Sequence, residues 1–333
     1  METAYTVRLR GYVQTVTVKA DPAAVRAYIS NPANVAIPGL KFEGAERSPA
    51  ENLIPTTGQT SPFVVRAVGI NIQGRILVVR SDEEKLWLLL ESPFGFHIQR
   101  WQFKPVKDGT QLTFQMEYEL QEKGIKGQLG KITELVGLGE ALEKGMDRML
   151  AEVQVHFDPS LEADQLVALG VRGEGYEAFL QVYETNVGIS APPDRVEAWA
   201  NNSENARMLM EQFQMENQYF SQFLELGPGQ ILYAPAVLAT KGLKSKAELF
   251  IFRDPDPESH GWKIFALSYG IGEMIEIQIE AGPGGSLLTF KIKSEIPTAL
   301  SSEQVDLMMH LLGIPQMLRD RALRIKNGVE QIG

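Results

Sequence analysis

The chain has 333 residues, which suits two domains of about 150 to 170 residues each better than a single one. Its 44% hydrophobic and 22% charged residues are typical of a folded globular protein and exclude disordered, collagen-like and coiled-coil chains. The sequence contains no cysteine, which excludes disulfides and thiol chemistry, and its formal net charge of −10 argues against nucleic acid or an anionic membrane as a partner.

The amino-terminal residues alternate between polar and apolar types and do not form the basic and apolar regions of a signal peptide. The longest apolar runs, such as Leu86 to Leu90, are far shorter than the roughly 20 residues of a membrane-spanning helix. We therefore expect no stable membrane insertion and a cytoplasmic location.

The first half opens with an alternating segment, Thr6 to Lys19, that predicts a strand. A helix follows, with Asp21 as its expected cap and Pro22 in its first turn. Five further strands are predicted to form an antiparallel meander: Phe63 to Ile72, Arg75 to Ser81, Lys85 to Glu91, Phe96 to Lys104 and Gln111 to Leu120.

A long helix is expected to close the first half, because apolar residues recur there at helical spacing. They are Leu129, Ile132, Leu135, Leu142, Met146, Met149 and Val153. Gly137 and Gly139 are expected to interrupt this helix. The interruption either lets the part from Gln128 to Val136 act as a lid over a cavity, or only lets the long helix follow a curved sheet.

The second half repeats the first. The segment from Thr17, TVKADPAAVRAYISNPANV, recurs from Gly188 as GISAPPDRVEAWANNSENA, and GTQLTFQMEYEL from Gly109 recurs from Gly285 as GSLLTFKIKSEI. We therefore predict a tandem duplication. Its second copy contains strands at Phe179 to Ser190, Gln230 to Ala239, Lys246 to Arg253, Trp262 to Tyr269, Met274 to Glu280 and Leu287 to Ile296.

The second closing helix is expected to bend at Gly313 and Pro315, since proline cannot donate the backbone hydrogen bond of a continuous helix. Its predicted apolar face comprises Val305, Met308, Leu312, Leu318, Ile325 and Val329. The Asp-Pro and glycine-rich stretch between the copies predicts a linker. The expected organisation is a domain over residues 1–157, a linker over 158–175 and a second domain over 176–333.

The order of strand, helices, meander and long helix resembles the SRPBCC, or START-like, helix-grip superfamily. Ile37-Pro38-Gly39-Leu40 resembles the family's turn into the second strand, and the second copy lacks this turn. The resemblance implies an α+β fold of two tandem helix-grip domains, each an antiparallel sheet wrapped around a long C-terminal helix. Because this fold carries many activities, it does not by itself assign one.

No strong catalytic or cofactor motif is present, neither a phosphate-binding loop nor HExxH nor GxSxG. The four histidines are far apart in the sequence and do not have the paired spacing of metal ligands. We therefore predict no metal site, no cofactor and no catalytic residue.

The alternation of the last two meander strands predicts which side chains point inward. This inward set is the candidate ligand-binding site: His97, Gln99, Trp101, Phe114, Met116 and Tyr118. The second copy has Glu273, Ile275 and Ser294 in place of His97, Gln99 and Tyr118, so we expect the conventional pocket in the first half alone. The alternative is that these polar side chains lie at the solvent-exposed end of a strand, or that a bulge turns them outward.

The favoured function is binding of an apolar or amphipathic small molecule, lipid-like or polyketide-like, without catalysis. One alternative is a polyketide cyclase or aromatase-like enzyme that uses His97 and Tyr118 as acid and base. Another is a protein-interaction module with filled cores. The expected partner is a small hydrophobic ligand and not nucleic acid, and strands that are apolar on both faces leave a homodimer open as a possibility.

Overall fold

The computed structural model describes residues 2–35, 41–43, 55–67, 70–92, 95–119, 138–170, 172–240, 243–253, 260–268, 271–296 and 301–331. These residues form an α+β chain of two compact units. The N-terminal unit comprises Arg8–Ala178, and the C-terminal unit comprises Phe179–Gly333 together with Met1–Val7.

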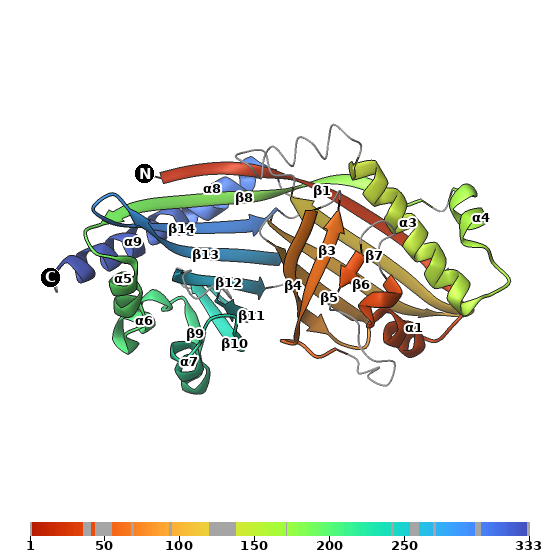
Figure 1. Cartoon of the computed structure of the whole chain (residues 1–333), viewed down its shortest axis with the longest axis horizontal. Coiled ribbons are helices and arrows are strands. Elements are labelled where there is room, and N and C mark those ends of the chain that lie inside the picture. The colour runs from red at the N-terminus through yellow and green to blue at the C-terminus, as the bar shows by residue number, and fades with distance from the viewer. Residues whose placement is uncertain are drawn as a thin grey trace. The chain divides into compact units, whose positions relative to one another are not determined.

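In the N-terminal unit the described strands form a sheet in the order β2-β3-β4-β5-β6-β7-β1 (Figure 1). Their bounds are β1 Glu2–Val18, β2 Lys41–Glu43, β3 Thr60–Ala67, β4 Ile70–Ser81, β5 Lys85–Ser92, β6 Gly95–Val106 and β7 Gly109–Glu119. The neighbours from β2 to β7, and β7 with β1, pair antiparallel, which confirms the predicted meander.

One predicted strand was wrong. The segment Phe63 to Ile72 is not continuous but spans the end of β3 and the start of β4, which pair with each other through Val65 and Ile72. Apolar residues occur both before and after the turn, so the sequence pattern does not show where β3 ends and β4 begins. The three-residue strand β2 is too short to show alternation, but it begins directly after Leu40, where the family resemblance led us to expect the second strand.

The helices of the N-terminal unit are α1 Pro22–Ile29, the 3-10 helix η1 Pro32–Val35, α3 Leu138–Phe157 and α4 Ala163–Ala168. Asp21 caps α1 as predicted: its carboxylate accepts hydrogen bonds from the amides of Ala23 and Ala24, each at 3.0 Å. Residues 120–137 lie outside the described residues, and with them the predicted lid and the kink at Gly137.

In the C-terminal unit the described strands follow the order β8-β14-β13-β12-β11-β10-β9. They are β8 Glu174–Ile189, β9 Phe213–Met215, β10 Ile231–Thr240, β11 Leu243–Phe252, β12 His260–Ser268, β13 Ile271–Gly282 and β14 Gly285–Glu295. The helices are α5 Pro193–Ala200, α6 Ser203–Leu209, α7 Asn217–Leu224, α8 Ser302–Leu311 and α9 Ile314–Gln331.

The two units repeat details as well as topology. The Asn34 side chain donates to the Tyr28 carbonyl at 2.9 Å, and Asn205 donates to the Trp199 carbonyl at the same distance. Each bond closes the turn after the first helix of its unit. The same residue positions therefore stabilise the same turn in both copies, as a tandem duplication requires.

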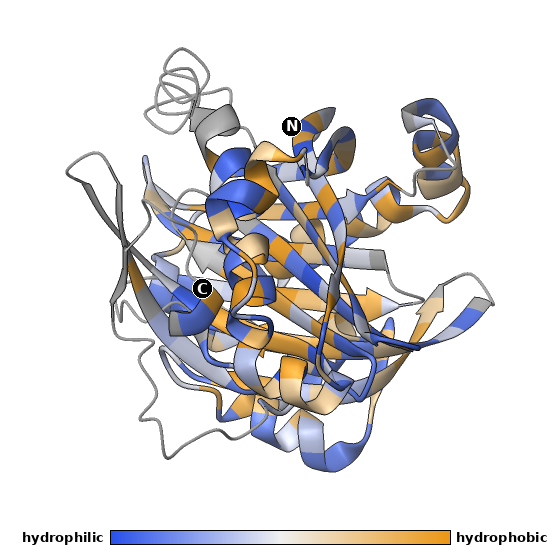
Figure 2. Ribbon diagram, turned by 90° about the vertical axis from the view of Figure 1, so that its right-hand side faces the viewer, coloured by the Kyte–Doolittle hydropathy of each residue, from blue (hydrophilic) through white to orange (hydrophobic). Residues whose placement is uncertain are grey.

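Inward side chains of the sheet and apolar faces of the closing helices form the core of each unit, and hydrophobic and hydrophilic residues alternate along the strands (Figure 2). In the N-terminal unit Met146, Met149 and Val153 of α3 are buried, as predicted. In the C-terminal unit the break at Gly313 is confirmed, with φ of +72°. Met308 was predicted to face the core but is 41% exposed, because the buried position on α8 is that of Met309.

These elements confirm the predicted α+β architecture of two tandem helix-grip units, each with an antiparallel sheet and closing helices. The Ile37-Pro38-Gly39-Leu40 turn lies outside the described residues.

Candidate functional site

A cavity of about 50 Å³ lies in the N-terminal unit between α1, η1 and the strands β3 to β6. By the usual 10 to 15 Å³ per water molecule, it has room for about four ligand heavy atoms. The residues that line it are Ile29, Ser30, Val35, Pro55, Gln59, Ser61, Ile76, Val78, Leu86, Leu88, Leu90 and Gln99.

The floor of the cavity is a row of aliphatic side chains on adjacent strands. Cross-strand pairing sets Val78 opposite Leu88, and Leu88 opposite Gln99. Because alternate residues of a strand share a face, Leu86 and Leu90 lie on the same side as Leu88. This part of the wall is apolar and suits an alkyl or ring carbon.

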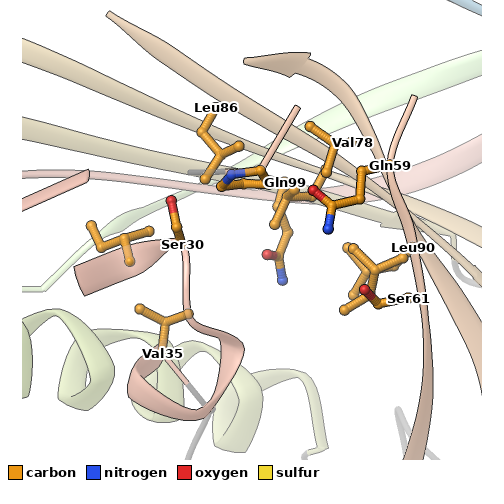
Figure 3. Close-up of a pocket in the computed structure, with 12 residues that line it drawn as sticks. Ser30, Val35, Gln59, Ser61, Val78, Leu86, Leu90 and Gln99 are labelled. Carbon is orange, nitrogen blue, oxygen red and sulfur yellow. The ribbon is translucent and has the colours of Figure 1, made fainter. Parts of the chain in front are cut away.

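Four polar but uncharged side chains complete the lining. Figure 3 shows the Gln99 amide between Ser30 on one side and Gln59 and Ser61 on the other. Amides donate and accept hydrogen bonds, and hydroxyl groups do both. Among the described residues that line the cavity none is charged, so the wall favours an uncharged polar group such as a hydroxyl or a carbonyl.

The wall of the cavity that includes Pro55 and Gln59 is held by hydrogen bonds to β4 and α1. The Ser81 hydroxyl donates to the Pro55 carbonyl and accepts from the Arg26 guanidinium at 2.6 Å. The Val78 amide donates to the Gln59 carbonyl at 2.9 Å. The end of α1 and the segment before β3 are therefore anchored on the same strand, which keeps the wall in place.

The structure brings together most of the predicted inward set. The cross-strand partners are His97 with Tyr118, Gln99 with Met116 and Trp101 with Phe114. Gln99 lines the cavity, and its amide lies 3.8 Å from the Met116 sulfur. The side chain of Tyr118 lies outside the described residues.

Trp101 and Phe114 belong to the core. Their side chains are 1% and 0% exposed, and their ring centroids lie 4.3 Å apart. Neither residue is among those that line the cavity. A ligand-binding role for the six residues stays a prediction, and Gln99 is the member of the set that the cavity geometry supports most directly.

Sequence reasoning missed Ser30, Gln59 and Ser61. Ser30 is the C-cap of α1, and its hydroxyl donates to the Arg26 carbonyl at 2.7 Å, which suggests only a structural role. Gln59 precedes β3 in a turn without periodicity. Their approach to Gln99 depends on how α1 and the turn pack on the sheet, and no local pattern signals it.

His97 lies two residues from Gln99 on β6. Burial lowers the pKa of its imidazole to about 4 from the ordinary value of 6.5. At neutral pH the side chain is therefore uncharged, in keeping with the uncharged lining of the cavity.

This lowered pKa predicts a pH-dependent stability. As the pH falls from 6.5 toward 4, the unfolded chain takes up a proton on His97 that the folded chain does not, so the free energy of unfolding decreases. One such group contributes at most about 1.4 kcal/mol per pH unit. Urea unfolding at pH 7 and pH 5 should show a smaller difference for His97→Gln than for the parent protein.

The buried Glu273 carboxyl, whose pKa is raised by burial, has the opposite dependence. It is present in both proteins, so the comparison isolates His97. Equal pH dependence in the parent and in His97→Gln would contradict a lowered pKa for this histidine.

Within the described part of the chain, no group of histidine and carboxylate side chains has the arrangement of a metal site. No described helix combines the length and the apolar character needed to cross a membrane.

Comparisons with known proteins find one family model and several solved structures that are similar to this chain. Residues 11–157 match the family model described as polyketide cyclase / dehydrase and lipid transport. This match supports a hydrophobic ligand-binding or cyclase-like role. No curated protein matches the chain.

Similar solved structures include two with two domains. The di-domain ARO/CYC StfQ from the steffimycin biosynthetic pathway is 12% identical, with 96% of this chain and 98% of that chain covered and a TM-score of 0.35. The di-domain ARO/CYC BexL from the BE-7585A biosynthetic pathway is 12% identical, with 98% of each chain covered and a TM-score of 0.31. A Rhodobacter sphaeroides protein is 16% identical, with 47% of this chain and 95% of that chain covered and a TM-score of 0.31. At such identities and TM-scores, no residue role is transferred from them.

Proposed function

We propose that the N-terminal unit binds an apolar or amphipathic small molecule in the cavity beside α1. The SRPBCC-type fold of the chain, in its two-domain arrangement, supports this proposal. The observation that carries this proposal is the composition of the cavity wall, which combines a row of aliphatic side chains with uncharged amide and hydroxyl groups. Such a wall is typical of a ligand pocket.

The ligand is uncharged where it enters the cavity. A carboxylate or an ammonium group would lose its hydration there without meeting an opposite charge among the described lining residues, which costs several kcal/mol. A hydroxyl or carbonyl group is satisfied by the Gln99 and Gln59 amides or by the Ser30 and Ser61 hydroxyls. With about 50 Å³ available, the cavity holds one narrow end of the ligand, such as the hydroxyl-bearing end of an alkyl chain.

A cyclase-like reaction is the second candidate, because the matching family model names cyclases. It requires an acid and a base near the ligand. His97 is the histidine on the inward face of β6, and a pKa of about 4 makes its imidazole a weak base at neutral pH. Binding without turnover is therefore the function that we favour.

The proposal is tested by filling the cavity. Leu88 is partly buried and lines the cavity, so Leu88→Trp is expected to occupy the space and to weaken binding of Nile red, a neutral dye whose narrow N-ethyl end can enter the cavity, at least ten-fold. The matched control is Leu169→Trp, because Leu169 belongs to the same unit and is 81% exposed. Fluorescence titration of the full chain measures both, and circular dichroism verifies that each variant is folded.

Displacement of the dye then reports the charge preference. We expect 1-decanol to displace Nile red at a lower concentration than decanoate does, since only the alcohol is uncharged. Equal binding by Leu88→Trp and Leu169→Trp would show that the dye does not use this cavity. Conversion of an added polyketide-like substrate by the parent protein would favour the cyclase instead.

A further inference from the structure

The C-terminal unit contains a cavity of its own, in a different part of the fold from the N-terminal one. It has a volume of about 160 Å³ and lies between the start of β1, the strand β8 and the junction of α8 with α9. Its lining residues are Thr3, Ala4, Tyr183, Glu184, Thr185, His310, Pro315 and Leu318. All of them belong to the C-terminal unit, so the cavity is formed within that unit.

The break between the two closing helices shapes this cavity. Gly313 adopts a φ of +72°, which favours glycine, and Pro315 follows in the first turn of α9. The junction contributes His310 from α8 and Leu318 from α9 to the same wall. A continuous helix would not turn at this point. The interruption at Gly313 and Pro315 therefore allows both α8 and α9 to line the cavity.

The polar groups of the cavity are held in defined positions. The buried Tyr183 hydroxyl donates to the Asp306 carboxylate at 2.6 Å, which ties α8 to β8. The His310 Nδ1 donates to the Asp306 carbonyl at 2.9 Å. In a neutral imidazole with its proton on Nδ1, the other ring nitrogen, Nε2, is a hydrogen-bond acceptor.

The volume and the walls define the size and shape of the ligand. A cavity of about 150 Å³ with apolar walls takes up one benzene ring. Here the Tyr183 and His310 rings meet edge to face at 5.9 Å, and Pro315 and Leu318 add aliphatic surface. A single six-membered ring therefore fits, whereas the N-terminal cavity of about 50 Å³ is too small for one.

The charges favour a neutral ligand over an anionic one. Glu184 also borders the pocket, but its side chain lies on the opposite face of β8 from Tyr183 and Thr185, where its carboxylate is paired with the Lys291 ammonium at 3.0 Å and the Asn186 amide at 2.8 Å. Asp306 stands directly behind Tyr183 and His310. A ligand carboxylate would thus face the Asp306 carboxylate, while a ligand hydroxyl group can donate to His310 Nε2.

We infer that this pocket is a second binding site that takes a neutral single-ring phenol, with its ring against Tyr183, Pro315 and Leu318 and its hydroxyl on His310 Nε2. This inference does not depend on the function proposed for the N-terminal cavity. It assigns a separate, ring-sized ligand to the C-terminal unit.

The test is a ¹⁹F NMR titration of the full chain with 4-fluorophenol, with 4-fluorobenzoate as the anionic control. For a ligand of this size a Kd on the order of 1 mM is expected. Ala4→Trp places a large side chain at an exposed position on the rim and should weaken binding at least ten-fold. His310→Phe keeps a ring but removes the acceptor nitrogen and should weaken binding about five-fold.

The matched control is Leu311→Ala, which changes an exposed residue of α8 outside the pocket and should bind like the parent protein. Leu88→Trp, which fills the N-terminal cavity, should also leave binding unchanged. Loss of phenol binding in Leu88→Trp, unchanged binding in Ala4→Trp, equal affinity for 4-fluorobenzoate, or no binding by the parent protein up to 10-fold above the expected Kd would each overturn the inference.

Discussion

Phe114→Ala is expected to lower the free energy of unfolding of the N-terminal unit by about 3 to 5 kcal/mol, the usual cost of removing a buried aromatic ring. Phe114 is 0% exposed and packs against Trp101 and against Tyr12, with ring centroids 4.3 and 6.0 Å apart. Its replacement leaves a void that these rigid rings cannot close. The urea unfolding transition of the N-terminal unit, followed by tryptophan fluorescence, measures the loss.

The matched control is Leu88→Ala, on the inward face of β5, which β6 separates from the strand of Phe114 in the same sheet. Leu88 borders the cavity and is only partly buried, so its truncation is expected to cost about 1 to 2 kcal/mol, below the range for fully buried leucine. A loss as small for Phe114→Ala as for Leu88→Ala would mean that Phe114 also borders open space. The ligand site would then extend to the predicted aromatic residues.

The second large effect is expected at Asp147, a carboxylate that is 3% exposed on α3. It accepts hydrogen bonds from the Tyr12 hydroxyl and from the Gly173 amide, each at 2.7 Å. Asp147→Ala should cost about 2 kcal/mol, because it removes the acceptor of the partly buried Gly173 amide and one of the two acceptors of the Tyr12 hydroxyl, the other being Gln14. The bonds join the closing helix to the first strand and to the segment before β8, so the variant should also expose this segment to proteolysis.

Asp147→Asn separates the hydrogen bonds from the charge. Its side-chain carbonyl still accepts a hydrogen bond, so the loss should be about half of that for Asp147→Ala. Tyr12 itself stays uncharged, since burial and the neighbouring Asp147 raise the pKa of its hydroxyl. If Asp147→Ala unfolds at the same urea concentration as the parent protein, this network does not stabilise the unit.

The sequence repeat predicted which residues of the two units occupy corresponding positions. His97 faces Tyr118 across β6 and β7, and Glu273 faces Ser294 in the corresponding place on β13 and β14. The shared face was predicted from alternation, because alternate residues of a strand point to the same side, and the correspondence between the two pairs was predicted from the constant offset of the repeat. The capped first helix and the helix break at Gly313 were predictable for the same reason, since each depends on the chemistry of a few consecutive residues.

The strand ends and the shortest elements were less predictable. The hairpin inside Phe63 to Ile72 was missed because apolar residues occur on both sides of it, and Met308 was assigned to the core because helical spacing alone does not distinguish it from Met309. On α8 the choice between Met308 and Met309 depends on which side of the helix packs against the core of the unit. That packing is a tertiary property.

By itself, the sequence determined the α+β class, the duplication, the order of strands and the inward face that carries Gln99, Trp101 and Phe114. Only the tertiary structure decided which of these side chains meet a cavity and which fill the core. The physical reason is that a face is set by local periodicity, whereas empty space is the volume left over when elements far apart in the sequence pack together. Ser30 and Gln59 reach Gln99, and His310 reaches Tyr183, only through that packing.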